Sequence, residues 1–235
     1  MNIIKVKTYE ELSQMAATII AGQILRKQDS VLGFATGSTP ELTYKNLIKM
    51  HQDGVLDFSK ITTFNLDEYC GLPKSNNQSY HYFMMHNLFN HVNIKHENIN
   101  IPDGEAHDIQ AMCRAYDNKI KHLGGIDLQL LGIGPNGHIA FNEPSKDLVY
   151  GTHQEKLTES TINANKRFFK SVDEVPTTAV TMGMGSIMAA KAILMIGSTG
   201  KEDIVNAAIH GPITTNVPAS LLQLHRKVTV IYVGK

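Results

Sequence analysis

The sequence is poor in cysteine, has no excess of charge of either sign, and contains no long hydrophobic run. Its 235 residues include only two cysteines, Cys70 and Cys113, which lie far apart along the chain. So few cysteines argue against a disulfide-stabilised scaffold and fit a reducing compartment such as the cytoplasm. We interpret both as buried small hydrophobic side chains rather than as catalytic nucleophiles.

The balance of charge excludes a general affinity for polyanions. Lysine plus arginine and aspartate plus glutamate number 22 each, so nothing attracts nucleic acid or an anionic membrane non-specifically. No apolar run approaches the roughly 20 residues of a membrane-spanning helix, and the first residues lack a signal-peptide pattern. We therefore expect a cytoplasmic protein with no nucleic-acid or membrane partner, in which any bound anion is held by a local site.

The histidines do not form a metal-binding pattern. His81, His86, His91 and His96 recur every five residues, and on a helix each step turns the side chain by roughly 140°, so they share no face. The chain also lacks an H-E-x-x-H motif and paired cysteine ligands. We therefore expect no metal site.

Short β-branched runs alternate with longer helical patterns, and 42% of the residues are hydrophobic. The expected strands are residues 31–36, 61–66, 128–133, 192–197 and 228–233, and the expected helices are 8–27, 40–51, 79–90, 106–123, 201–210 and 218–225. This alternation predicts one α/β domain over residues 1–235, with an open, mainly parallel twisted sheet and helices on both faces, as in Rossmann-like folds. Residues 145–180 are polar and predicted to be irregular, either as a lid over a site or as a surface insertion.

Ligands of such sheets bind beyond the carboxyl ends of the strands. After the strand 31–36 come Gly37, Ser38 and Thr39, which lead into a helix with Pro40 at its first position. Glycine, hydroxyls and a helix N-terminus make a phosphate-binding turn, although an ordinary tight turn capped by Thr39 is equally consistent. After the strand 192–197, Lys201 adds a positive charge to a second such turn; by itself, a solvated surface lysine is the commoner explanation.

Asp67 follows the expected strand 61–66. An acid at the end of a buried strand is a candidate general base with a shifted pKa. The commoner use of such an aspartate is to cap a helix or a turn, and the residues alone leave both open.

The stretch GIGPNGHIAFNEP, residues 132–144, contains the G-x-G-x-x-G pattern of a dinucleotide-binding turn. That fingerprint needs a helix that begins among its glycines, and Pro135 and Pro144 prevent one. It also needs an acidic residue at the end of a strand about 20 residues on, where GTHQEKLTES is not predicted to form a strand. We reject the cofactor interpretation.

What remains is a tight turn that presents Asn136, His138 and Glu143. His138 would serve as an acid–base group if Glu143 orients its imidazole and sets its pKa. A structural histidine is the alternative.

Together these motifs resemble the glucosamine-6-phosphate deaminase family. The resemblance covers essentially the whole chain and is carried, in the order of that family, by ATGSTP, NLDEYCGLP, GIGPNGHIAFNEP, ANKRFF and LQLH. It implies the reversible conversion of glucosamine 6-phosphate and water to fructose 6-phosphate and ammonia, without a cofactor, so the expected partner is a small-molecule sugar phosphate.

The resemblance also implies roles for individual residues. Asp67 would move a proton between C2 and C1, His138 would open the sugar ring, and Glu143 would support His138. The residues expected to bind the phosphate are Gly37, Ser38, Thr39, Arg167 and Lys201. Without the resemblance, Arg167 would be interpreted as a solvated surface residue.

Asn136 departs from some members of the family, which carry aspartate there. Asparagine adds no negative charge, so we predict weaker support for a charged His138 and a shifted pH profile. Larger relatives are allosteric hexamers with longer C-termini, and for this chain we expect a monomer or small homo-oligomer. A 6-phosphogluconolactonase-like hydrolase and a non-catalytic sugar-phosphate sensor are the alternative functions.

Overall fold

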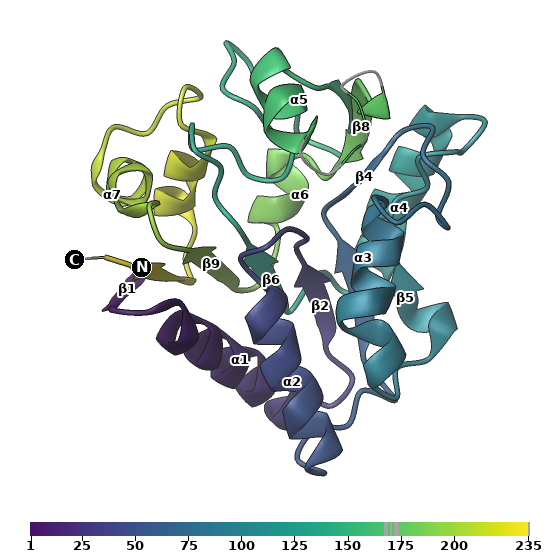
Figure 1. Ribbon diagram of the computed structural model, residues 1–235, viewed down its shortest axis with the longest axis vertical. Helices are drawn as coiled ribbons and strands as arrows, with labels where there is room; N and C mark the ends of the chain where they lie inside the picture. The colour runs from purple at the N-terminus through teal and green to yellow at the C-terminus, as the bar shows by residue number, and fades with distance from the viewer. Residues whose placement is uncertain (167–168, 170, 172–173, 235) are drawn as a thin grey trace.

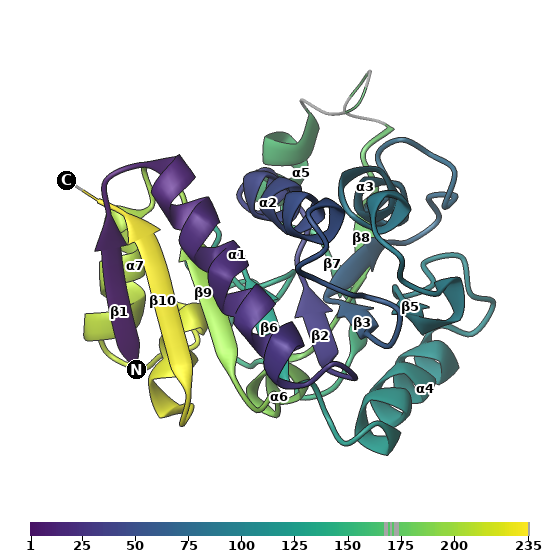
Figure 2. The ribbon, with the colours of Figure 1, turned by 90° about the horizontal axis from the view of Figure 1, so that it is seen from below.

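The computed structural model describes residues 1–166, 169, 171 and 174–234. Its largest element is a parallel sheet of seven strands in the order β1-β10-β9-β6-β2-β3-β5 (Figure 1). The strands are β1 (Asn2–Val6), β2 (Val31–Phe34), β3 (Thr62–Asn65), β5 (Ile99–Asn100), β6 (Leu128–Leu131), β9 (Ile193–Gly197) and β10 (Val228–Val233). The first and last strands of the chain, β1 and β10, lie side by side (Figure 2).

Helices cover both faces of this sheet, as the sequence predicts. The central strands β2, β6 and β9 are buried along their whole length, which explains why, apart from Gln129 in β6, they are apolar rather than alternating. Helices α1 and α2 lie on one face and α7 on the other (Figure 2). The helices are α1 (Tyr9–Arg26), α2 (Glu41–Gln52), α3 (Tyr80–Asn87), α4 (Ile109–His122), α5 (Glu159–Asn165), α6 (Met184–Met188) and α7 (Glu202–His210), with short 3-10 helices at Phe89–His91, His96–Asn98 and Pro218–Leu224.

The direction in which the sheet grows reverses between β2 and β6. From β2 the chain continues to β3 and β5 on one side, whereas β6 lies on the other side of β2 and leads to β9 and β10. The connections that leave β2 and β6 therefore diverge, and their carboxyl ends open a crevice where ligands of such folds bind.

A second, smaller sheet adjoins this crevice. It is antiparallel, in the order β4-β8-β7, with β4 (Asp67–Tyr69), β7 (His153–Lys156) and β8 (Thr178–Thr181). Only Leu66 separates β4 from β3, and its carbonyl accepts a hydrogen bond from the amide of Met182 at 2.7 Å. The chain thus passes from one sheet into the other immediately before Asp67.

Some sequence expectations are wrong in this region. The prediction that residues 145–180 are irregular fails because the segment contains β7, α5 and β8, and the GTHQEKLTES stretch includes the whole of β7. Exposed and half-buried side chains alternate along β7, so its sequence lacks the apolar run that marks a buried strand. The sequence also gave no signal for β1, β5 and α6, and residues 218–224 form a 3-10 helix rather than an α-helix.

Candidate active site

The turn after β2 is built to receive an anion. Gly37 has φ of +95°, a left-handed conformation that glycine adopts without strain. Helix α2 begins at Glu41, and Pro40, rather than Thr39, occupies its N-cap. Pro40 provides no side-chain cap, and the hydroxyl of Tyr9 accepts the amide of Leu42 at 3.2 Å. The amides that precede Leu42 are therefore the ones available to an anion such as phosphate.

The turn after β9 meets the turn after β2. Thr39 and Ser198 join the two turns through their hydroxyl oxygens, which lie 3.3 Å apart. Lys201 is the N-cap residue of α7, and within the described part of the chain its ammonium group has no ion-pair partner. Burial lowers the pKa of Lys201. A partly desolvated cation beside a helix N-terminus favours an anionic ligand.

Asp67 is the first residue of β4 and pairs with Thr181 of β8. Its side chain is only 6% exposed, and among the described residues its Oδ1 has no hydrogen-bond partner. Burial, together with the nearby charge of Glu68, raises the pKa of Asp67 to about 8. This aspartate is therefore neither a helix cap nor a turn cap, and its carboxyl group is a strong base once ionised.

Glu68 is a residue of this region that sequence reasoning missed. Its carboxylate accepts hydrogen bonds from the amides of Tyr69 and Tyr80, both at 2.9 Å, and of His81 at 2.8 Å. These bonds fasten the first turn of α3 to β4 and fix the backbone beside Asp67. The sequence shows that an acidic residue follows Asp67, but it does not predict that Glu68 bonds to backbone amides 12 and 13 residues further along the chain.

The turn after β6 brings His138 to the site. The amide of Gly134 bonds to the carbonyl of His138, and the amide of Gly137 bonds to the carbonyl of Gly134, both at 3.0 Å. A Cβ atom at Gly134 would lie 2.2 Å from Nε2 of His138. Glycine at 134 is therefore needed to make room for the imidazole ring.

Glu143 lies behind His138 and is held from three sides. Its Oε1 is 3.2 Å from Nδ1 of His138, although the two atoms are too poorly aligned for a good hydrogen bond. The hydroxyl of Thr161 donates to the same Oε1 at 2.6 Å, and the amide of Asn136 donates to Oε2 at 2.7 Å. Burial alone would raise the pKa of Glu143, but the contacts with His138, Thr161 and Asn136 outweigh it and lower the pKa to about 2. Glu143 is ionised at neutral pH and can support a positive charge on His138.

Asn136 contacts Glu143 rather than the imidazole ring of His138. In addition to its bond to Glu143, its Oδ1 accepts the backbone amide of His138 at 3.2 Å. Any influence of Asn136 on the charge of His138 therefore acts through the position and charge of Glu143.

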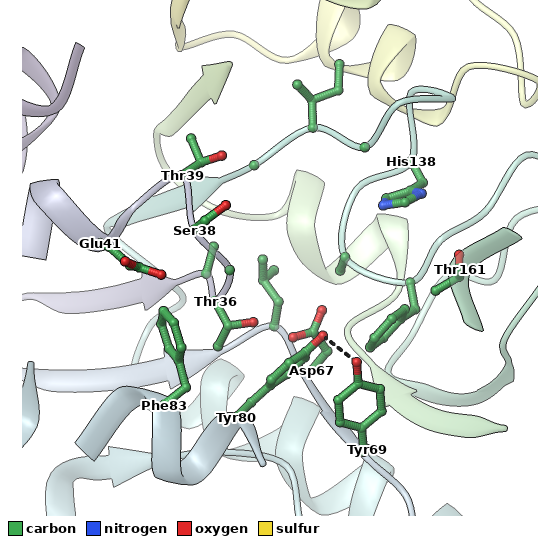
Figure 3. Close-up of a pocket in the computed structure, with 18 of the residues that line it drawn as sticks. Thr36, Ser38, Thr39, Glu41, Asp67, Tyr69, Tyr80, Phe83, His138 and Thr161 are labelled. Carbon is green, nitrogen blue, oxygen red and sulfur yellow. Dashed lines mark hydrogen bonds between the residues drawn. The ribbon is translucent and has the colours of Figure 1, made fainter. Parts of the chain in front are cut away.

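These groups meet in one cavity of about 480 Å³. Gly37, Ser38, Thr39, Asp67, His138 and Lys201 all line it, and Figure 3 shows Ser38, Asp67 and His138 around the same space. Asn136 and Glu143 lie outside the lining, behind His138. Arg167 lies outside the described residues.

The cavity also has an aromatic wall that sequence reasoning missed. The rings of Tyr80 and Phe141 stack with centroids 6.1 Å apart, and Tyr69 packs against both. Figure 3 shows Tyr69 and Tyr80 side by side. Phe169 meets Tyr69 edge to face and lines the cavity, as does Thr161 of α5. Residues of the 145–180 segment thus border the cavity, which is where a lid would have to lie.

Two absences apply to the residues that the structure describes. Within them, no helix is both long and apolar enough to span a membrane. Nor does any group of three or more histidine, cysteine, aspartate or glutamate side chains in that part of the chain have the arrangement of a metal site.

Known proteins resemble this chain over nearly its whole length. Residues 5–231 match the model of a family described as glucosamine-6-phosphate isomerases/6-phosphogluconolactonase. A protein of Thermoanaerobacter sp. (strain X514) named glucosamine-6-phosphate deaminase is 55% identical over 232 residues, which cover 98% of this chain and 92% of that protein.

Solved structures give the same picture. One described as a monomeric glucosamine-6-phosphate deaminase is 47% identical with a TM-score of 0.94, covering 99% of this chain and 97% of that one. The 6-phosphogluconolactonase of Thermotoga maritima has a TM-score of 0.77 at 20% identity, covering 100% of this chain and 99% of that one. At that identity the second likeness concerns the fold alone.

Proposed function

Because this chain belongs to the glucosamine-6-phosphate isomerase/6-phosphogluconolactonase family, we propose that it converts glucosamine 6-phosphate and water to fructose 6-phosphate and ammonia. The observation that carries the proposal is the buried carboxyl group of Asp67 in the same cavity as His138 and the phosphate-type turns. Hydrolysis of a lactone needs no base that takes a proton from carbon, whereas isomerisation of an amino sugar does.

The first step is opening of the sugar ring. His138 takes the proton of the anomeric hydroxyl and delivers a proton to the ring oxygen, so that C1 becomes an aldehyde. Glu143, ionised and 3.2 Å from the imidazole, stabilises the imidazolium that forms in between. A positioned acid–base group of this kind typically contributes about 10²–10⁴-fold to the rate.

The second step is transfer of a proton between C2 and C1. Asp67 removes the proton from C2, which is acidic because it lies beside the aldehyde, and a proton of the substrate's ammonium group passes to O1, which gives an enol that carries a neutral amine. Asp67 then returns its proton to C1, which leaves an imine at C2. Water hydrolyses the imine to a ketone and releases ammonia.

The raised pKa of Asp67 suits this task. A carboxylate that holds a proton up to about pH 8 in the free protein is a much stronger base than an ordinary aspartate. The positively charged amine of the substrate favours the ionised form when it binds alongside. The amine and the carbonyl of the substrate act as the electron sink, so the proposed reaction requires no cofactor.

The phosphate group fixes the other end of the substrate. Gly37, Ser38 and Thr39 offer backbone amides and hydroxyls at the N-terminus of α2, and Lys201 offers an ammonium group from the neighbouring turn. Arg167 remains a predicted phosphate ligand on the strength of the ANKRFF motif. We propose that the 145–180 segment acts as a lid that brings this arginine to the phosphate.

The proposed reaction belongs to amino-sugar catabolism and would serve the use of N-acetylglucosamine. We further propose that residues 1–235 act as a single domain and as a monomer or small homo-oligomer. The likeness to a solved deaminase described as monomeric supports this oligomeric state.

The direct test is to incubate the protein with glucosamine 6-phosphate and to measure ammonia and fructose 6-phosphate by coupled enzyme assays. We expect equal amounts of both products, a slower reaction when C2 carries deuterium, and almost no product with Asp67→Asn. A parallel assay with 6-phosphogluconolactone tests the hydrolase alternative. Absence of product from the wild type, or full activity of Asp67→Asn, would overturn the proposal.

A further inference from the structure

The donors that hold Glu143 come from two separate parts of the chain. Asn136 and His138 belong to the same turn as Glu143, whereas Thr161 lies 18 residues further on, in α5. Thr161 donates to Oε1, the carboxylate oxygen that faces the imidazole of His138. The orientation of the acid–base pair therefore depends on a side chain outside the turn.

The hydrogen bonds around Thr161 have only one possible direction. Its Oγ1 lies 3.1 Å from the hydroxyl of Thr158, the N-cap residue of α5, and 2.6 Å from the carboxylate of Glu143. The ionised carboxylate can only accept, so the single hydroxyl proton of Thr161 points to Glu143. Thr158 donates to Thr161 and accepts the backbone amide of Thr161 at 3.2 Å. The chain of bonds thus runs from the start of α5 to Oε1 of Glu143.

We infer that Thr161 is a positioning residue, through which α5 holds Glu143 in the orientation that His138 needs for ring opening. This inference rests on the proposed function. Thr161 is 8% exposed and lines the cavity, so α5 both borders the cavity and sets the acid–base pair. A helix that borders the cavity is in this way linked to the first chemical step.

A variant that lacks the hydroxyl of Thr161 distinguishes the positioning of Glu143 from substrate binding. In Thr161→Val, Oε2 of Glu143 keeps its bond to Asn136, but Oε1 keeps only the poorly aligned contact with His138. The carboxylate can then turn away from the imidazole. The phosphate turns lie on other strand ends and are unaffected, so kcat falls while KM for glucosamine 6-phosphate stays the same.

The expected fall in kcat for Thr161→Val is roughly 10- to 100-fold, the value of one hydrogen bond to a charged group, with KM within about two-fold. Thr161→Ser keeps the hydroxyl and restores most of kcat. Thr161→Ala is a second test, because alanine favours the helix and removes the hydroxyl without adding bulk.

Thr152→Val is the matched control. Thr152 is also 8% exposed, belongs to the same segment, and donates to a carboxylate, that of Asp117, at the same 2.6 Å. Its hydroxyl bonds to Asp117 rather than to Glu143, and Thr152 is not among the residues that line the cavity. We expect a lower thermal unfolding temperature, as for Thr161→Val, but an unchanged kcat.

A double-mutant cycle decides whether Thr161 acts through Glu143. In the Glu143→Gln background, Thr161→Val should cause no further loss of kcat, whereas a separate structural role of α5 would give losses that multiply. Multiplying losses, or wild-type kcat in both Thr161→Val and Thr161→Ala, would overturn the inference and leave the proposed function intact. A wild type without deaminase activity would instead refute the proposed function.

Discussion

Replacing Asp67 by asparagine should make the protein more stable at neutral pH while it abolishes activity. Burial and the charge of Glu68 raise the pKa of Asp67 from 3.8 to about 8, so the folded protein disfavours the ionised carboxylate. Asparagine has nearly the same shape and carries no charge, and its introduction removes this cost together with the proposed base.

The magnitude follows from the shift in pKa. Below about pH 4 the carboxyl group is protonated in both the folded and the unfolded chain, and it costs nothing. As the pH rises from about 4 to 8 the unfolded chain loses the proton and the folded protein keeps it, so stability falls by about 1.4 kcal/mol per pH unit. At pH 7 the cost is roughly 4 kcal/mol, a large share of the 5–15 kcal/mol typical of a domain.

The assay is urea unfolding of the wild type and of Asp67→Asn between pH 5 and 8. The free energy of unfolding of the variant should exceed that of the wild type by an amount that grows with pH. Asp127→Asn is the matched control: Asp127 is also 6% exposed, but although burial would raise its pKa, Lys191 and Lys27 outweigh burial and lower it. Ionised Asp127 thus stabilises the fold above the pKa that it has in the unfolded chain, and this stability is lost as the pH falls through its pKa in the folded protein. Asp127→Asn should therefore be less stable than the wild type at neutral pH.

A difference between the wild type and Asp67→Asn that does not change with pH would refute the reasoning. It would show that Asp67 has an ordinary pKa in the folded protein and that its burial carries no electrostatic cost. The loss of activity in the same variant would then need another explanation.

Three further predictions concern the turns around the cavity. Gly134→Ala should lower kcat on the order of 100-fold, the contribution of a positioned acid–base group, because the added Cβ would lie 2.2 Å from the imidazole of His138. Steady-state kinetics together with a thermal unfolding scan would separate displacement of His138 from misfolding. Lys201→Gln should raise KM roughly ten-fold with little change in kcat, because a charge-assisted bond to phosphate is lost. Inhibition by inorganic phosphate should weaken in parallel. An unchanged KM would argue against a contact between Lys201 and the phosphate. Asn136→Asp should shift the pH–rate profile, because it replaces the amide that donates to Glu143 at 2.7 Å with a second carboxylate. The two carboxylates would then share a proton, which raises the pKa of Glu143. A pH–rate profile identical to that of the wild type would contradict this role of Asn136.

The sequence alone was sufficient for the features that depend on local pattern. Apolar runs such as Val31–Phe34 and Ile193–Gly197 mark strands buried on both faces, because such strands have no polar side to alternate with. The parallel sheet with helices on both faces follows from their alternation with helical segments. The residues after these strands could be named in advance, because parallel strands bring their carboxyl ends to one edge.

Only the tertiary structure decided what those residues contact. Asp67 belongs to β4 of a second sheet, where it pairs with Thr181 more than 100 residues away, and its raised pKa is a consequence of that burial. The bond from Thr161 to Glu143 likewise joins segments that become neighbours only when the chain folds. Local sequence fixes backbone preference and the chemistry of a side chain, whereas burial and long-range partners set its pKa and orientation, and these depend on the packing of the whole chain.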